Sequence, residues 1–89
     1  MKKQIAQVKL IKKIPCPFCD RAVQLLKEKN IEAEILDYTH DLDQLMEWKN
    51  KTGWATVPII LINDTLIGGY TDLKELDESG DLDKRVFGE

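Results

Sequence analysis

The sequence predicts an α/β fold whose elements follow in the order β-α-β-α-β-β-α. Apolar residues alternate with polar ones in two early segments, they recur at helical spacing in the segments that follow each of these, and a continuous isoleucine-rich run stands at 58–62. Because a helix separates the first two strands, these strands should be parallel. We therefore expect a four-stranded mixed sheet with helices on both faces, in a single domain over residues 1–89.

The first three elements are the most regular. A strand is expected over residues 5–11, where apolar residues alternate with glutamine and lysine before the Pro-Cys-Pro segment at 15–17. A helix should cover residues 17–29, and Asn30 is a suitable helix stop. The segment 31–37 alternates again, with glutamates on the polar side, as a second strand should.

The middle of the chain predicts a helix followed by a hairpin. Residues 41–51 carry a broad apolar stripe, and Gly53 stands just beyond it as a stop. The apolar run at 58–62 is typical of a buried strand, Asn-Asp at 63–64 of a tight turn, and Leu-Ile at 66–67 of a short returning strand.

The last helix is expected to begin with Thr71 or Asp72 as its cap and to end at Gly80. The tail at 81–89 is short and charged, and its pattern assigns it to no element. The sequence shows no repeat, linker or low-complexity segment.

Composition excludes several classes of protein. The chain is 43% hydrophobic and 33% charged, which suits a packed globular core. Its net charge of −3 argues against a nucleic-acid partner. The longest stretch without a charged or amide residue is 52–62, far short of the ~20 apolar residues of a membrane span, and Gln4, Gln7 and Lys9 interrupt any signal-like segment. We expect a cytoplasmic protein without a membrane partner.

The strongest chemical feature is Cys16-Pro17-Phe18-Cys19, at the junction of the first strand and first helix. Two neighbouring cysteines are too few for a secreted disulfide framework, so the spacing favours redox activity. Two alternatives remain open: inert buried cysteines, or half of a zinc site. A zinc site needs about four ligands, and the chain adds only the distant His40, which fits a solvated loop.

The position of the pair predicts different roles for the two thiols. A helix N-terminus offers partial positive charge and free N–H donors to a thiolate, so we expect Cys16 to be largely ionised at neutral pH. Lys12 and Lys13, just upstream, act in the same direction. Cys19 lies one turn further along, beside Asp20, where an ionised sulfur is less favoured. We expect Cys16 to attack disulfides and Cys19 to resolve the product.

The motif at 16–19 resembles the Cys-Pro-Tyr-Cys site of dithiol glutaredoxins. Lys13 stands three residues before the first cysteine, where that family usually has a lysine. Thr-Val-Pro at 56–58 matches a loop of the family, and Gly-Gly at 68–69 followed by Thr-Asp-Leu at 71–73 matches its glycine pair and Asp segment. The resemblance covers nearly the whole chain and implies a thioredoxin-like (glutaredoxin) fold.

By this resemblance, Thr56, Val57 and Pro58 belong to a glutathione-binding site. Pro58 would follow a cis peptide bond, which leaves the N–H and C=O of Val57 unpaired at the sheet edge. An extended peptide such as glutathione could pair with them as a short added strand, which would place its sulfur against Cys16. The alternative is that these residues form an ordinary loop before a core strand.

Five further residues complete the implied glutathione site. Gly69 allows close approach to the backbone, and Thr71 would supply helix-start N–H groups to the γ-glutamyl carboxylate. Asp72 would take the γ-glutamyl ammonium, Lys13 the glycine carboxylate, and the Phe18 ring would pack beside the ligand. Alternatively, Asp72 is only a helix cap, the glycines only a turn, and Lys13 a solvated lysine.

The chain also departs from the family in three places. Phe18 replaces the usual tyrosine and lacks its hydroxyl. Trp54 and Ala55 precede the Thr-Val-Pro loop, where many members carry a basic residue. This puts one contact to the glycine carboxylate in doubt. Tyr70 follows the glycine pair, where the family often has a small residue or a cysteine.

The resemblance implies a monomeric oxidoreductase that uses glutathione to reduce glutathionylated proteins and protein disulfides. Glutathione would be a co-substrate, with no permanently bound cofactor and no metal. Two other functions stay open. A thioredoxin-like protein reduced by a flavoenzyme would not need Thr71 and Asp72. A carrier of an iron-sulfur cluster, ligated by Cys16 and glutathione, is disfavoured by the rigid Pro17.

Overall fold

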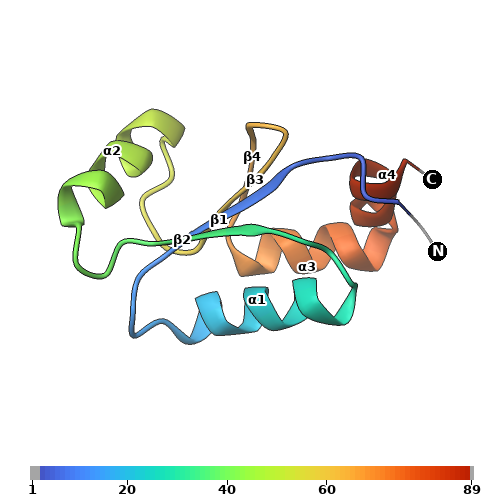
Figure 1. The fold of residues 1–89 in the computed structure, drawn as a ribbon, viewed down its shortest axis with the longest axis horizontal. Helices are drawn as coiled ribbons and strands as arrows, with labels where there is room; N and C mark the ends of the chain where they lie inside the picture. The colour runs from blue at the N-terminus through green and yellow to red at the C-terminus, as the bar shows by residue number, and fades with distance from the viewer. Residues whose placement is uncertain (1–2, 89) are drawn as a thin grey trace.

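The computed structural model describes residues 3–88 and contains the expected four-stranded mixed sheet (Figure 1). Its strands lie in the order β2-β1-β3-β4. β1 pairs in parallel with β2 and antiparallel with β3, and β3 pairs antiparallel with β4. The bounds are Val8–Lys12 for β1, Glu34–Asp37 for β2, Ile59–Ile62 for β3 and Thr65–Gly68 for β4. The predicted pairing of the strands is confirmed.

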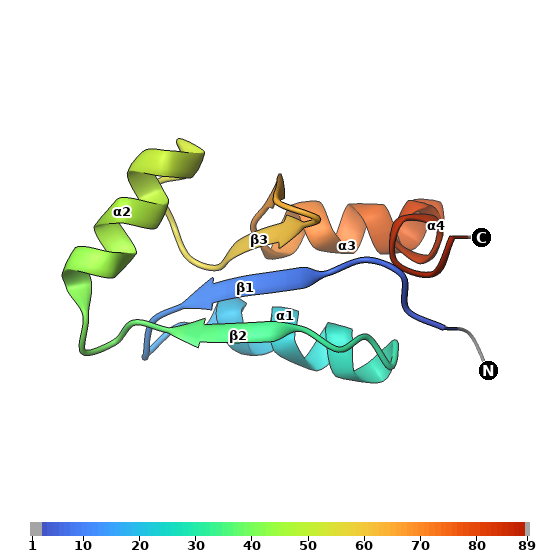
Figure 2. The same cartoon turned by 45° about the horizontal axis from the view of Figure 1, so that its top comes forward.

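Helices lie on both faces of the sheet, as predicted. α1 and α3 contact each other on one face, and α2 lies on the other side, near the end of the sheet where β1 and β2 finish (Figures 1 and 2). α4 lies against α3 at the opposite end of the molecule. The bounds are Pro17–Glu28 for α1, Leu42–Thr52 for α2, Tyr70–Ser79 for α3 and Asp81–Phe87 for α4.

The two faces of the sheet carry separate hydrophobic clusters. Leu10 and Ile60 join the cluster beneath α1, α3 and α4, whereas Ile11 and Ile59 join the cluster beneath α2. Alternate side chains of a strand point to opposite faces, so β1 and β3 are buried on both sides. This explains why β3 is apolar throughout rather than alternating. The central strands are therefore held rigidly, and the loops at their ends start from fixed positions.

Both early strands are shorter than the alternation predicted, since residues 5–7 and 31–33 lie outside β1 and β2. Beside residue 32, hydrogen bonds from the side chain of Gln4 replace the backbone hydrogen bonds of a strand pair. The Gln4 side-chain amide donates to the Glu32 carbonyl at 2.7 Å and accepts from the Glu32 N–H at 2.7 Å. The backbone groups of Glu32 are thus satisfied without strand pairing.

The hairpin between β3 and β4 has the predicted turn, and α3 begins differently from the prediction. Asn63 and Asp64 both have positive φ, as a type I′ turn requires. The cap of α3 is Gly69, not Thr71 or Asp72. Asp72 instead occupies the third helical position, and its carboxylate accepts the Gly69 N–H at 3.0 Å.

Gly68 is required immediately before this cap. Its φ is +123°, a backbone conformation that other residues avoid, and a Cβ there would lie 2.5 Å from a carboxylate oxygen of Asp72. The glycine thereby lets the Asp72 side chain fold back over the start of α3. The expected cap role of Asp72 is thus real, although it caps from inside the helix.

The charged tail forms α4, which the sequence pattern did not assign. Leu82 and Val86, four residues apart, are fully buried against the core. Lys29, just after α1, makes ion pairs with Asp77 at 3.0 Å and Asp83 at 3.2 Å, and so links α1 to α3 and α4. None of the helices in residues 3–88 has the length and apolar character that crossing a membrane requires.

Leu73 tests whether α3 is held by the core. Its side chain is completely buried, so Leu73→Ala should lower the free energy of unfolding by about 2 to 5 kcal/mol through lost burial and the cavity left behind. Denaturant unfolding measures this loss. Lys74→Ala, at the exposed neighbouring position, should change stability little. An equal effect of both substitutions would contradict the described packing.

Candidate active site

The two thiols of the Cys-Pro-Phe-Cys segment lie at the start of α1, as predicted. Cys16 is the N-cap of this helix, and Pro17 is its first residue. The Cys16 sulfur accepts a hydrogen bond from the Cys19 backbone N–H, with a sulfur–nitrogen distance of 3.1 Å. Cys16 is half-buried and Cys19 completely buried, and both are free thiols. A sulfur in this place receives the N–H and the positive end of the helix dipole.

Cys16 also reaches the Thr-Val-Pro loop. The Val57–Pro58 peptide bond is cis, as the resemblance implied. The expectation that the Val57 carbonyl is unpaired is wrong in this state, because the Cys16 thiol donates to it over 3.7 Å. The Val57 N–H has no hydrogen-bond partner within residues 3–88. Loss of the Cys16 proton removes the donor and leaves both backbone groups of Val57 available to a ligand.

The environment of Cys19 differs sharply from that of Cys16. Burial raises the pKa of the Cys19 thiol to about 12, and the neighbouring Cys16 adds to this rise. Cys19 therefore remains protonated at neutral pH, whereas the Cys16 sulfur is partly exposed and faces an N–H donor. The lesser tendency of Cys19 to ionise agrees with the prediction, but its main cause is burial rather than the neighbouring Asp20.

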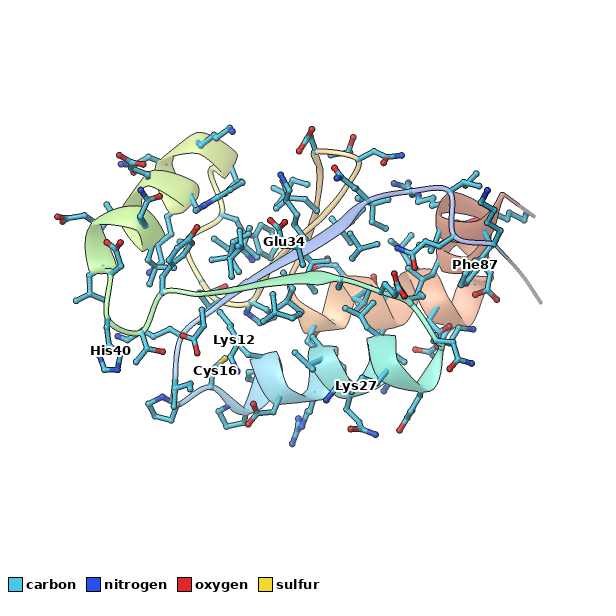
Figure 3. The ribbon with its side chains drawn as sticks, in the orientation of Figure 1. Lys12, Cys16, Lys27, Glu34, His40 and Phe87 are labelled. Atoms are coloured by element: carbon cyan, nitrogen blue, oxygen red, sulfur yellow. The ribbon has the colours of Figure 1, made fainter. Side chains whose placement is uncertain are left out.

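A hydroxyl group holds the loop that precedes Cys16. The Ile14 N–H donates to the Thr39 Oγ1 at 2.9 Å, and that hydroxyl donates to the Asp37 carboxylate. The Thr39 N–H donates to the same carboxylate, and these two bonds hold the pKa of Asp37 below its ordinary value. The end of β2 is thus tied to the active-site loop. His40, beside Thr39, is exposed and lies apart from Cys16 in Figure 3, as expected of a solvated residue.

A groove of about 630 Å³ lies beside Cys16, between the start of α3, the Thr-Val-Pro loop and the end of α2. Val57 belongs to its lining, and the Val57 carbonyl accepts a hydrogen bond from the Cys16 thiol, so the groove approaches the sulfur although Cys16 itself does not line it. The structure brings all of the sequence-predicted binding residues to this one groove: Lys13, Phe18, Thr56, Val57, Pro58, Gly69, Thr71 and Asp72.

The groove also includes residues that the sequence analysis did not assign to a site. Leu45 and Lys49 come from α2, where their spacing of four residues places them on one helix face. The sequence spacing could have shown that Leu45 and Lys49 share a helix face. Only the position of α2 in the fold shows that this face is directed toward the groove. Trp54 lines the groove beside Gly69, and its indole Nε1 is buried with no hydrogen-bond partner in the described part of the chain.

Aromatic side chains line the part of the groove near the cysteines. The Phe18 and Tyr70 rings are 6.4 Å apart, and both line the groove. The Arg21 guanidinium lies 5.4 Å from the Phe18 ring centroid. Phe18 is 52% exposed, so its ring keeps surface available for a ligand. The substitution of phenylalanine for tyrosine thus preserves an aromatic wall.

Other parts of the molecule lack this combination. A larger hollow of about 840 Å³ is lined by residues near the end of α1 and by Phe87, which lies far from Cys16 in Figure 3. Across residues 3–88, no group of three or more His, Cys, Asp or Glu side chains is placed to hold a metal ion. The groove beside Cys16 is the place where a reactive thiol and a ligand-sized hollow meet.

The different environments of the thiols should appear in their rates of alkylation. At pH 7 one equivalent of iodoacetamide should modify Cys16, because the pKa of about 12 leaves Cys19 almost without thiolate. Mass spectrometry of the digested protein locates the label. In Cys16→Ser, labelling should be slow and should accelerate only as the pH rises toward the pKa of Cys19. Fast labelling of Cys19 at neutral pH would contradict the assignment.

Comparison with known proteins agrees with this site. The glutaredoxin family model matches residues 8–67. Glutaredoxin 3 of Escherichia coli K12 is 37% identical over 79 residues, which cover 89% of this chain and 95% of that protein. The solution structure of a Brucella melitensis glutaredoxin superimposes with a TM-score of 0.80 at 31% identity, covering 91% of this chain and 88% of that one.

A buckwheat glutaredoxin-glutathione complex shares the fold, with a TM-score of 0.83 at 21% identity over 91% of this chain and 76% of that chain. The family match spans the first cysteine, the second cysteine and the Thr-Val-Pro loop. Together with the free thiols at the start of α1, these findings assign a thiol-disulfide oxidoreductase activity. The chain belongs to the glutaredoxin family.

Proposed function

We propose that this protein uses glutathione to reduce protein-glutathione mixed disulfides and protein disulfides, as a single monomeric domain. The observation that carries the proposal is the groove that all eight of the expected binding residues line, with Val57 of that lining in contact with Cys16. The structural neighbour from buckwheat that forms a complex with glutathione supports it. Glutathione would act as a co-substrate rather than as a permanently bound cofactor.

The polar groups of the groove suit an extended peptide with charged ends. The free N–H of Val57, and its carbonyl once Cys16 is ionised, would pair with the cysteinyl backbone of glutathione. The γ-glutamyl end would meet the start of α3, where the N–H of Thr71 faces a carboxylate and Asp72 an ammonium. Lys13, at the other side of the groove, would meet the glycine carboxylate.

Reduction of a glutathionylated protein needs only one cysteine of the enzyme. The Cys16 thiolate attacks the glutathione sulfur, the new Cys16–glutathione disulfide forms, and the substrate protein leaves as a thiolate that takes up a proton. A second glutathione, as its thiolate, attacks the glutathione sulfur of this intermediate. Oxidised glutathione leaves, and Cys16 returns to the thiolate form.

Reduction of a protein disulfide needs both cysteines. The Cys16 thiolate forms a mixed disulfide with the substrate, and Cys19 then attacks Cys16 and releases the reduced substrate. The first step changes the environment of Cys19. Cys16 adds to the rise in the Cys19 pKa through a hydrogen bond and through charge, and both effects end when its sulfur enters a disulfide. Cys19 therefore becomes a better nucleophile only after Cys16 has reacted.

Substitution of each cysteine separates the two reactions. Cys19→Ser should retain reduction of a small glutathione mixed disulfide and lose reduction of a protein disulfide, because the first reaction never uses Cys19. Cys16→Ser should abolish both. Coupled glutathione turnover and thiol release from an oxidised protein substrate measure the two rates. An active Cys16→Ser variant would show that the roles are assigned wrongly.

Asp72 tests whether the γ-glutamyl ammonium is recognised by charge. Asp72→Asn keeps an oxygen to accept the Gly69 N–H, so α3 should remain capped while the charge is lost. We expect a KM for a glutathione mixed disulfide that is higher by roughly threefold to tenfold, the range of a partly exposed ion pair, with kcat unchanged. Asp72→Ala should also lower the melting temperature. If Asp72→Asn leaves KM unchanged, Asp72 is a helix cap only.

A further inference from the structure

The loop between β1 and α1 is held by the segment that follows β2. The Tyr38 N–H donates to the Lys12 carbonyl at 3.0 Å, which continues the parallel pairing of β1 and β2. Two residues further along, the Ile14 N–H donates to the Thr39 Oγ1 at 2.9 Å. The Tyr38 carbonyl, which a continuing ladder would use, accepts instead from the Asp41 N–H at 3.0 Å. The Thr39 hydroxyl therefore supplies one further bond between the two segments.

Asp37 fixes the direction of this hydroxyl. The Thr39 hydroxyl donates to the Asp37 carboxylate, and the Thr39 N–H donates to the same group at 3.0 Å. A hydroxyl whose proton is committed to a carboxylate presents a lone pair to the Ile14 N–H and is a stronger acceptor for it. Both bonds lower the pKa of Asp37, so the carboxylate is ionised at neutral pH. The bond to Ile14 is therefore oriented at neutral pH.

The segment that Thr39 holds also faces the resolving thiol. The Lys13 backbone N–H forms a hydrogen bond with the Cys19 sulfur and lowers the pKa of that thiol, against the larger effect of burial. Lys13 precedes Ile14 directly, and the next residue, Pro15, has no N–H to donate. Because the two N–H groups are adjacent in the chain, a bond that restrains Ile14 also restrains the Lys13 N–H.

Cys16 is held by other groups. Its carbonyl accepts the Asp20 N–H at 3.1 Å, its sulfur accepts the Cys19 N–H at 3.1 Å, and its thiol donates to the Val57 carbonyl. These partners belong to α1 and to the Thr-Val-Pro loop, not to the segment after β2. The Thr39 hydroxyl therefore acts on the surroundings of Cys19 more directly than on those of Cys16.

We propose that Thr39 is a positioning residue for the resolving step: its hydroxyl, oriented by Asp37, keeps the Lys13 N–H on the Cys19 sulfur. The inference rests on the part of the proposed function in which Cys19 attacks Cys16 within a mixed disulfide. The attacking sulfur must carry negative charge, and an N–H donor stabilises that charge. Loss of the Thr39 hydroxyl would slow this step and leave the first attack by Cys16 unaffected.

Two further groups act on the ionisation of Cys19. Cys16 raises the pKa of Cys19, and the charge of Lys12 lowers it. The first effect ends in the mixed disulfide of every variant, and the second comes from a residue whose carbonyl is held by a backbone N–H rather than by the Thr39 hydroxyl. A slower resolving step on loss of that hydroxyl would therefore be traced to the Lys13 N–H.

The experiment follows both steps in one reaction with the aromatic disulfide dithiobis(nitrobenzoate), added as one equivalent. The Cys16 thiolate attacks one of its sulfurs, forms a mixed disulfide and releases one coloured thionitrobenzoate. Cys19 then loses its proton to solvent, attacks the Cys16 sulfur, forms the Cys16–Cys19 disulfide and releases the second thionitrobenzoate. Stopped-flow absorbance separates the two phases, and the second is unimolecular. The reaction requires no glutathione.

Thr39→Val removes the hydroxyl and keeps the shape of the side chain. It should slow the second phase at neutral pH by about threefold to tenfold and leave the first unchanged. A hydrogen bond to a charged sulfur changes the thiolate fraction by roughly tenfold to a hundredfold, and the greater nucleophilicity of a thiol of higher pKa offsets about half of this on a logarithmic scale. Thr39→Ser keeps the hydroxyl and should restore the second phase. Thr65→Val, the same change at an exposed position of β4, should alter neither phase.

The pH dependence of the second phase gives a separate readout. The Lys13 N–H lowers the pKa of Cys19, so its loss in Thr39→Val should move the rise of the rate to higher pH. An unchanged second phase in Thr39→Val, or equal slowing of both phases, would overturn the inference alone.

Two results with the unsubstituted protein bear on the proposed function itself. The absence of a unimolecular second phase would overturn both the resolving role of Cys19 and the role of Thr39. A protein that shows both phases but does not turn over a glutathione mixed disulfide would overturn the use of glutathione and leave the role of Thr39 standing.

Discussion

The hydrogen bond from the Cys19 backbone N–H to the Cys16 sulfur is the constraint on which the site depends. It makes the reactive sulfur the cap of α1, so the atom that performs the chemistry also completes the helix. A thiolate is a better acceptor for this N–H than a thiol, and the helix dipole favours the same charge. The same hydrogen bond therefore fixes both the start of α1 and the position of the Cys16 sulfur.

The rest of the fold fixes what surrounds that sulfur. Strands β1 and β3 are buried on both faces, and the loops at their ends carry Cys16 and Val57 to within contact. Thr39 ties the first of these loops to the end of β2 through the Ile14 N–H. The ends of β1 and β2 and the start of β3 thus lie at the same end of the sheet. The groove forms there because α2 and α3 stand on either side of it.

Local patterns predicted the fold well, because each depends on a few neighbouring residues. The strand alternation, the helical stripes and the turn at Asn63 and Asp64 all have the expected counterparts. Features set by tertiary packing were not predictable in the same way. The two buried residues of α4 are too sparse to identify a helix without the core they fill. Likewise, the face of α2 that carries Lys49 gains a meaning only when the direction of that helix is known.

The charges of the groove also bear on how an anionic ligand could bind this chain. The protein has a net charge of −3, so its overall field does not attract glutathione, which has two carboxylates and one ammonium. The groove offers the reverse set of charges, two lysines and one aspartate. At physiological ionic strength, charges further away than about 8 Å are largely screened. In the proposed function, recognition of glutathione would come from these few groups and from the backbone of Val57, so their placement would matter more than the net charge.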